Sequence, residues 1–319
     1  MGNTLLQYVR SIFAIILFHL LRIFFTKINQ YKRNILFIHT AGLGDLIYTF
    51  KIICNLEKLD NYNYFLMVKE EHKGLFDDYK GNFKIIFLNY DMYRLNIFYR
   101  IKVIKVLRDY TFLKVFQLNH NRRIIDDDLA VHTGANQIVA FNIVEKGFPK
   151  LFKQMFDRYY DRILFEKPQE INTKIDIFLQ QTFNINHFEK THISMDEKKI
   201  LNSLNSKISR LLDQEYIIIN PLSSAGIRDW NFDQLNEIVV FLSEQYNYKI
   251  FLVGNTKQYK FLQRLTLKSD KIINLGGLTD ILESFLIVKY CKLFIGIDSA
   301  LSHVARYFDI QLHSSTLQG

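Results

Sequence analysis

Asp45 ends a short loop, Thr40–Asp45 (TAGLGD), between an apolar run and an amphipathic segment. A carboxylate at this position could act as a general base, because the carboxyl edge of a parallel sheet is where such folds bind their ligands. Gly42 and Gly44 would let a ligand approach the backbone closely. The alternative role for Asp45 is an N-cap of the following helix. The loop lacks the third glycine of a dinucleotide fingerprint and the Gly-Lys-Ser/Thr of a P-loop.

A second polar cluster follows the apolar run Tyr216–Asn220 and consists of Ser223, Ser224 and Arg228. Two hydroxyl donors and a planar cation suit the oxygens of a diphosphate. The N-terminus of the next helix would add partial positive charge. The alternative is an ordinary turn with a surface arginine. Trp230, the only tryptophan, is expected to anchor this turn by packing.

A third cluster contains Asp298, Ser299 and Ser302, with His303 five residues after Asp298. These residues could form a phosphate-binding helix N-terminus with the imidazole as a charge or hydrogen-bond donor. The alternative is a set of helix caps and a partly buried histidine. A hydrolase triad is excluded, because the chain has no Gly-x-Ser-x-Gly segment. Gly276, in the preceding loop, would let a nucleotide approach the backbone.

The composition bounds the classes of protein to consider. A length of 319 residues favours two domains, and 49% hydrophobic with 23% charged residues indicates a folded globular protein. A net charge of +9 favours anionic partners such as nucleotide phosphates or lipid headgroups. No nucleic-acid-binding module is recognisable, so nucleic acid is not expected as a partner. Cys54 and Cys291 form no CxxC pair or Cys/His cluster, so we expect no structural metal.

Apolar runs alternate with helix-length segments, which predicts a doubly wound parallel sheet in each of two domains. Residues 92–110 are predicted to form one amphipathic helix, and residues 150–210 helices and a linker without strands. The expected strands are Ile35–His39, Tyr64–Val68, Phe83–Leu88 and Val115–Leu118, then Tyr216–Asn220, Lys249–Val253, Lys271–Asn274 and Leu293–Ile297.

Residues 5–25 are predicted to form an amphipathic helix, with Gln7, Arg10, Ser11, His19, Arg22 and Thr26 within one half of its circumference. Such a helix can lie in the headgroup layer of an anionic membrane. The alternatives are a helix packed on the protein's own core and a spanning helix or uncleaved signal. Arg10 and Arg22 enclose only eleven residues, which disfavours a span. We therefore expect three parts: residues 1–33, 34–180 and 181–319.

Taken together, the clusters resemble glycosyltransferase family 9, the heptosyltransferase-like enzymes of lipopolysaccharide core assembly. The segment His39–Thr49 is similar to the opening loop of that family, and Asn220–Trp230 to the start of its second domain. Gly296–Arg306 resembles its signature G-x-D-(S/T)-G-x-x-H-x-A-A, and Asn119–Asn142 its arginine-rich segment. The order and spacing of these segments make the resemblance specific over roughly residues 34–310.

The resemblance implies a GT-B fold, with two Rossmann-like domains facing a cleft, the acceptor on the first and the donor on the second. It implies inverting transfer of a heptose or related sugar from a nucleotide diphosphate, such as ADP-heptose, to lipopolysaccharide or a lipid-linked glycan, with neither metal nor cofactor. Asp45 would be the base. Ser223, Ser224 and Arg228 would hold the diphosphate, while Asp298, Ser299 and His303 would bind the donor sugar or phosphate.

Three residues depart from the family pattern: His39 replaces an arginine, Ala41 a serine and Ala300 a glycine. The sequence also ends nine residues after Ile310, where the family continues through another strand. We therefore expect the second domain to lack an outer strand and activity to be reduced. A catalytically impaired remnant that binds nucleotide is the alternative. An epimerase or dehydrogenase is disfavoured, because it would need a complete dinucleotide fingerprint. The expected location is the cytoplasmic face of the bacterial inner membrane, with the first helix at its surface.

Overall fold

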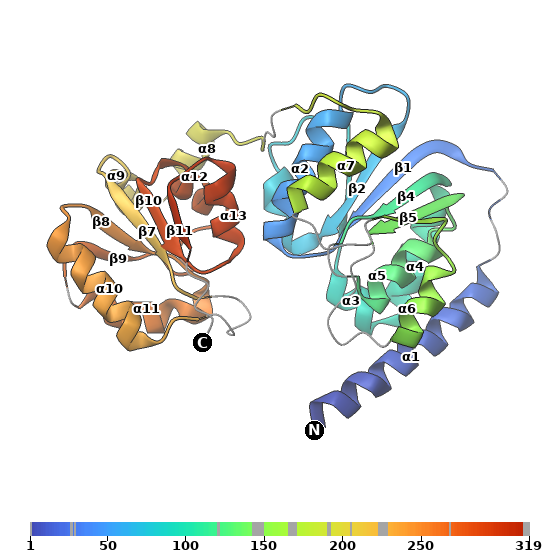
Figure 1. Cartoon of the computed structure of the whole chain (residues 1–319), viewed down its shortest axis with the longest axis horizontal. Coiled ribbons are helices and arrows are strands. Elements are labelled where there is room, and N and C mark those ends of the chain that lie inside the picture. The colour runs from blue at the N-terminus through green and yellow to red at the C-terminus, as the bar shows by residue number, and fades with distance from the viewer. Residues whose placement is uncertain are drawn as a thin grey trace. The chain divides into compact units, whose positions relative to one another are not determined.

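In the computed structural model, the chain forms two compact units (Figure 1). The first comprises Met1–Phe76 and Lys80–His192, and the second Asp77–Tyr79 and Ile193–Gly319. The structure describes residues 2–25, 28, 30–119, 122–141, 150–164, 171–189, 193–204, 206–222, 229–267 and 269–314.

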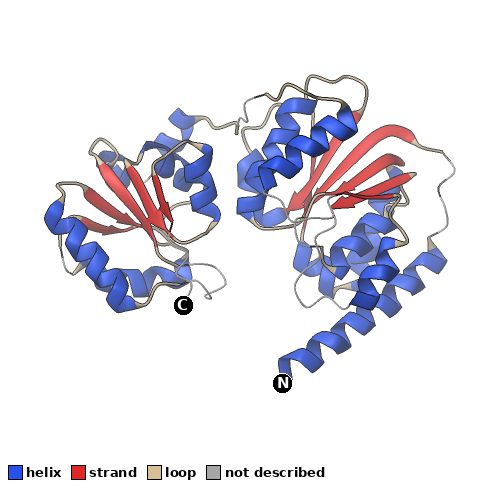
Figure 2. Ribbon diagram, viewed as in Figure 1, coloured by secondary structure: helices blue, strands red, loops and turns tan. Residues whose placement is uncertain are grey.

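The first unit is a six-stranded parallel sheet of order β3-β2-β1-β4-β5-β6 with helices on both faces (Figure 2). Its strands are β1 (Lys32–His39), β2 (Asn63–Lys69), β3 (Lys84–Leu88), β4 (Phe112–Gln117), β5 (Gln137–Phe141) and β6 (Arg162–Leu164). Its helices are α1 (Gly2–Phe24), α2 (Leu43–Leu56), the 3-10 helix η1 (Glu70–Phe76), α3 (Tyr90–Leu95), α4 (Ile97–Asp109), α5 (Ile124–His132), α6 (Lys150–Asp157) and α7 (Ile171–Phe183).

Successive side chains of β1 reach opposite faces of this sheet, and both faces are covered. Leu36 and Ile38 join the core cluster that contains residues of α1, α4 and α5. Phe37 packs on the other face, with its ring 6.4 Å from that of Phe178 on α7. Because both faces are buried, the strand reads as a continuous apolar run, as is typical of parallel sheets.

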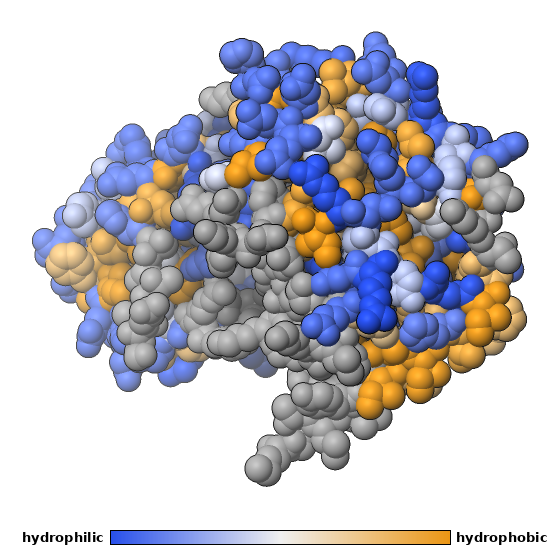
Figure 3. All heavy atoms as spheres, turned by 45° about the vertical axis from the view of Figure 1, so that its right-hand side comes forward, coloured by the Kyte–Doolittle hydropathy of each residue, from blue (hydrophilic) through white to orange (hydrophobic). Residues whose placement is uncertain are grey.

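Helix α1 is confirmed as a helix, and one of its faces packs on the first unit. Phe18 and Leu21 are buried, and the ring of Phe18 lies 4.8 Å from that of Phe156 on α6. The opposite face is also apolar but exposed, and Figure 3 shows apolar side chains gathered at the lower right, where this helix runs. Its exposed large apolar side chains are Ile12, Phe13, Ile16, Leu20, Ile23 and Phe24. Among the described residues, no helix combines the length and hydrophobicity needed to cross a membrane.

The second unit is a five-stranded parallel sheet of order β11-β10-β7-β8-β9. Its strands are β7 (Tyr216–Asn220), β8 (Lys249–Leu252), β9 (Ile272–Asn274), β10 (Leu293–Gly296) and β11 (Leu312–Ser314). Its helices are α8 (Glu197–Ser203), α9 (Ser206–Leu211), α10 (Phe232–Gln245), the 3-10 helix η2 (Thr256–Gln258), α11 (Tyr259–Thr266), α12 (Ile281–Tyr290) and α13 (Ala300–Tyr307). Two α/β units with parallel sheets confirm the expected fold class.

Three sequence expectations about the elements are wrong. The single helix predicted over 92–110 is two helices, because Asn96 leaves the helical conformation and its side chain accepts a hydrogen bond from the Tyr99 amide, which caps α4. Residues 150–210 do contain a strand, β6, which is only three residues long and extends the sheet beside β5. The final stretch, expected to lack an outer strand, forms β11 beside β10.

The expected boundary between residues 180 and 181 falls inside α7. This helix packs against α2, and the ring of Phe178 lies 5.1 Å from that of Phe116 on β4. The whole of α7 therefore belongs to the first unit.

Candidate functional site

The loop that carries Asp45 lies at the carboxyl end of β1. Helix α2 begins at Leu43, and Gly42 is its N-cap, without a side-chain hydrogen bond. Asp45 is therefore the third helical residue, and the alternative role as N-cap is wrong. A half-buried carboxylate in the first turn of a helix is stabilised as an anion by the helix dipole. This position suits a base that must remain ionised.

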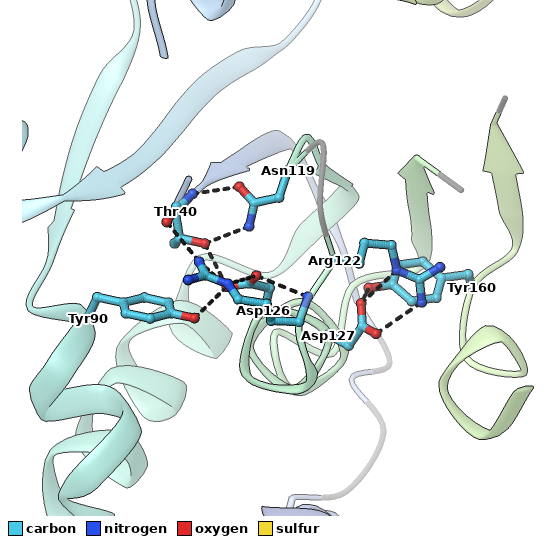
Figure 4. Close-up of polar contacts among 8 residues, drawn as sticks. Thr40, Tyr90, Asn119, Arg122, Asp126, Asp127 and Tyr160 are labelled. Carbon is cyan, nitrogen blue, oxygen red and sulfur yellow. Dashed lines mark hydrogen bonds and ion pairs between the residues drawn. The ribbon is translucent and has the colours of Figure 1, made fainter. Parts of the chain in front are cut away.

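A buried hydrogen-bond network holds the start of this loop (Figure 4). The Thr40 amide donates to Oδ1 of Asn119 at 2.8 Å, and Nδ2 of Asn119 donates to the Thr40 hydroxyl at 2.7 Å. That hydroxyl donates to Oδ1 of Asp126 at 2.7 Å. Arg123 donates to the Thr40 carbonyl at 3.0 Å, and the Tyr90 hydroxyl donates to Asp126 at 3.0 Å. The backbone ahead of Asp45 is thus fixed by groups from α3, α5 and the segment between β4 and α5.

Three consecutive aspartates at the start of α5 are fully buried, and each has its own arginine. The pairs are Asp126 with Arg123, Asp127 with Arg122, and Asp128 with Arg100. The Asp127 pair has two bonds of 3.0 Å, and the Tyr160 hydroxyl adds a third of 2.6 Å (Figure 4). Burial raises the pKa of Asp127, although the charge of Arg122 opposes it. The three carboxylates have no exposed surface, so they are neutralised within the fold and do not face a ligand.

Two buried histidines flank the loop and are neutral. Nδ1 of His39 lies 3.1 Å from the Thr49 hydroxyl on α2, and burial lowers the pKa of His39 to about 3. Nε2 of His72, on η1, donates to the Ala41 carbonyl at 3.4 Å, and burial lowers its pKa as well. Neither imidazole can supply positive charge beside the loop near neutral pH.

The glycines of the expected loops have different surroundings. A Cβ atom at Gly42 would meet nothing within 4 Å, so the chain itself does not require glycine there and space remains in front of the loop. Gly44 is buried in α2. Gly276 donates to Oδ1 of Asn274 at 2.9 Å, and a Cβ atom at Gly296 would lie 2.5 Å from the Asn220 carbonyl oxygen. Close packing of the chain therefore explains Gly296 without a ligand.

In the second unit, Ser223, Ser224 and Arg228 lie outside the described residues. The ends of their loop are described: the Trp230 amide donates to the Pro221 carbonyl at 3.0 Å. Trp230 is buried in the core cluster between the sheet and α10, so its expected packing role is confirmed. The loop thus begins and ends at the carboxyl end of β7.

The third cluster lies at the N-terminus of α13. Ser299 is the N-cap, and its hydroxyl accepts from the Ser302 amide, while the Ser302 hydroxyl donates to the Ser299 carbonyl at 2.7 Å. Nε2 of His303 lies 3.5 Å from the Asp298 carboxylate. Both side chains are partly exposed, 20% for His303 and 37% for Asp298. A paired carboxylate and imidazole at a helix N-terminus could contact both hydroxyls and phosphate of a ligand.

In the part of the chain that the structure describes, no group of three or more His, Cys, Asp and Glu side chains could hold a metal ion.

The family model of glycosyltransferase family 9 (heptosyltransferase) matches residues 147–310, more than half of the chain. The chain belongs to glycosyltransferase family 9. No curated protein matches its sequence.

Solved structures of glycosyltransferases share the fold at low sequence identity. A family 9 glycosyltransferase from Veillonella parvula is 16% identical, with 90% of this chain and 81% of that chain covered and a TM-score of 0.68. ADP-heptose lps heptosyltransferase II from E. coli is 16% identical over 88% and 84%, with a TM-score of 0.64. E. coli heptosyltransferase WaaC with ADP-2-deoxy-2-fluoro heptose is 12% identical over 88% and 88%, with a TM-score of 0.65. The two E. coli structures are GT-B heptosyltransferases.

For this family 9 glycosyltransferase, sequence reasoning found the loop of Asp45 and the Asp298–His303 pair but missed the network beneath Thr40. The signal was present as the run Arg122–Asp128 (RRIIDDD), which looks like an ordinary exposed charged stretch. Such a run does not by itself indicate buried ion pairs. The pairs become recognisable only when distant partners, such as Arg100, are known from the structure.

Proposed function

We propose that this glycosyltransferase moves a heptose or related sugar, with inversion, from a nucleotide-diphosphate donor to lipopolysaccharide or a lipid-linked glycan, without a metal cofactor. The observation that carries this proposal is the position of Asp45. It lies in the first turn of α2, after a loop whose start is fixed by buried hydrogen bonds to Thr40. A carboxylate that is already held in one position loses little conformational entropy when an acceptor hydroxyl binds beside it.

In the proposed step, the Asp45 carboxylate accepts the proton of the acceptor hydroxyl. The oxygen attacks the anomeric carbon opposite the leaving group, and the bond to the nucleoside diphosphate breaks with its electron pair. We place Gly42, which is exposed, on the acceptor side, with Gly44 buried behind it in the first turn of α2. The residues proposed to bind the donor and the leaving diphosphate are Ser223, Ser224, Arg228, Gly276, Asp298, Ser299 and His303. Hydrogen-bond donors and cations aimed at the departing diphosphate would supply the charge stabilisation.

ADP-heptose is the donor we propose, on two grounds. The family model is described as that of a heptosyltransferase, and the similar WaaC structure holds an ADP-heptose analogue. The Asp298–His303 pair can contact sugar hydroxyls and phosphate together, as a nucleotide sugar requires.

The experiment is a sugar-transfer assay with ADP-heptose and lipopolysaccharide that lacks the transferred sugar. Asp45→Asn should lower kcat by about 10²–10⁴-fold, the contribution of a general base. Asp91→Asn is the matched control, because Asp91 is an exposed aspartate of the same unit, paired with Arg94. Equal activity of Asp45→Asn and the wild type would show that Asp45 is not the base.

Donor binding is tested separately by calorimetry with ADP and with ADP-heptose. We expect Asp298→Asn and His303→Gln to weaken ADP-heptose binding, whereas Glu237→Gln, on α10, should not. Binding of ADP without sugar transfer to any acceptor would leave the nucleotide-binding module as the function. Absence of ADP binding, followed by binding of a UDP-, GDP- or CMP-sugar, would replace the donor.

We further propose that α1 lies on the cytoplasmic face of the bacterial inner membrane. Its outward face exposes Phe13, Ile23 and Phe24 by 68%, 74% and 77%. The first 44 residues contain five lysines and arginines and no acidic residue. Apolar side chains beside positive charge suit an anionic lipid surface, where a membrane-embedded acceptor would be presented.

Sedimentation with vesicles tests this proposal. Binding should be strong to vesicles containing phosphatidylglycerol and weak to pure phosphatidylcholine. Phe13→Glu combined with Ile23→Glu should abolish it. Phe241→Glu is the control, because Phe241 is an exposed aromatic residue of α10, 57% exposed. Binding unchanged in the double variant would exclude α1 as the contact.

A further inference from the structure

A lysine is buried beside the helix that carries Asp45. Lys174 lies on α7 and has no exposed surface. Helix α7 packs against α2 (Figure 1), and the charge of Asp45 acts on the ammonium group of Lys174. Burial of an ammonium group costs several kcal/mol before compensation. A buried lysine at this position therefore needs a negative charge nearby that compensates for its burial.

The helix dipoles do not compensate for the burial of Lys174. Lys174 is the fourth residue of α7, and Asp45 is the third residue of α2. The first turn of a helix carries partial positive charge and disfavours a cation. Both helix ends thus oppose Lys174, and the Asp45 carboxylate is the charge that favours it.

A second charge pair between the same helices has the opposite polarity and is more exposed. Lys51 of α2 forms an ion pair with Asp176 of α7, with 18% and 33% of these side chains exposed. This pair can align α2 with α7 without a buried cation. Alignment of the helices therefore does not require Lys174.

We propose that Lys174 is a positioning residue for the candidate base: its ammonium group keeps the Asp45 side chain ionised and in a fixed orientation. This inference rests on the proposed function, because it assigns Lys174 a role only through Asp45. A neighbouring cation favours the carboxylate over the protonated acid, so Asp45 would stay ready to accept a proton at lower pH. Burial lowers the pKa of Lys174 to about 8, although the charge of Asp45 raises it, so the lysine is largely protonated at pH 7.

Among the described residues, four other titratable groups next to the loop are neutral or paired with another carboxylate. His39 at the end of β1 and His72 on η1 are neutral at pH 7, because burial lowers the pKa of each. Lys69 at the end of β2 pairs with Glu71 at 3.1 Å. Lys51 on α2 pairs with Asp176 on α7.

The first test is the pH dependence of kcat/KM for Lys174→Met, which keeps the length of the side chain and removes its charge. We expect the acid limb, which reports Asp45, to move up by about one pH unit. Lys51→Met, which breaks the other pair between α2 and α7, should keep the acid limb of the wild type. An unmoved limb in Lys174→Met, or equal movement in both variants, would overturn the proposal.

The second test needs no turnover. Protein with ¹³Cε-labelled lysine is titrated by NMR, and the Lys174 signal is identified by its loss in Lys174→Met. In Asp45→Asn the pKa of Lys174 should fall, because the attraction that raises it is gone; an unchanged pKa would refute the coupling. Transfer activity retained in Asp45→Asn would instead refute the proposed base, while this titration would still decide whether Lys174 and Asp45 interact.

Discussion

His39 should make the first unit sensitive to mild acid. The folded protein holds this imidazole neutral in the core, with only 1% of the residue exposed. Burial lowers the pKa of His39 from 6.5 to about 3. Between these two values the unfolded chain binds a proton that the folded chain does not, so stability is complete above pH 6.5 and is lost as the pH falls towards 3.

The loss of unfolding free energy follows from the difference between these two pKa values. Each pH unit within it costs about 1.4 kcal/mol for one proton. Lowering the pH from 6.5 to 5 should therefore remove about 2 kcal/mol of unfolding free energy through His39 alone. This is a large fraction of the stability of an ordinary domain.

The assay is urea unfolding at pH 7 and pH 5, followed by far-ultraviolet circular dichroism. His39→Gln keeps a polar group near the Thr49 hydroxyl and removes the titration, so its loss of stability at pH 5 should be smaller by about 2 kcal/mol. His19→Gln, which removes an exposed histidine of α1, is the control. Trp230 fluorescence follows the second unit in the same samples, since it is the only tryptophan. An identical pH dependence of His39→Gln and the wild type would refute the reasoning.

Three further outcomes are expected. Arg122→Met should destabilise the first unit by about 3–5 kcal/mol in urea unfolding, because Asp127 would keep a buried charge without its cation; recovery in Arg122→Met/Asp127→Leu checks that cause, and a change below 1 kcal/mol would contradict it. Gly296→Ala should lower the melting temperature, because the added Cβ would meet the backbone of β7. Gly42→Ala should leave the melting temperature unchanged but impair acceptor binding. Equal melting temperatures of the two variants would contradict this prediction. Asn96→Ala should lower the free energy of unfolding of the first unit by about 1 kcal/mol, because it removes the cap of α4. A urea midpoint equal to that of the wild type would contradict this prediction.

The elements that sequence reasoning located well share one property: their signal is local. Strand β7 was predicted with its observed limits, because four strand-forming residues and Asn220 are bounded by Glu215 and Pro221. The start of α12 is also set locally, because the Asp280 side chain accepts a hydrogen bond from the Glu283 amide at 2.8 Å. Strand β6 was missed, because three residues carry no detectable periodicity and only pairing with β5 makes them a strand.

The sequence supplied the residue types of the candidate site but not the surroundings of those residues. The sequence left open whether Asp45 caps a helix, and the start of α2 two residues earlier decided against it. The sequence likewise gave no sign that Lys174, within a polar stretch of the middle segment, is buried. Its surroundings depend on the packing of α7 against α2, which no local pattern encodes.

The sequence by itself determined the alternation of strands and helices, the two parallel sheets and the family, because apolar periodicity and the spacing of Gly, Ser and Asp are written along the chain. The tertiary structure alone decided which charges are buried and what neutralises them. Thr40 meets Asn119 and Asp126 from 79 and 86 residues away, and Asp128 meets Arg100 from 28 residues away. The free energy of an ionised group depends on its distance from solvent and from opposite charge, and both are properties of the packed fold.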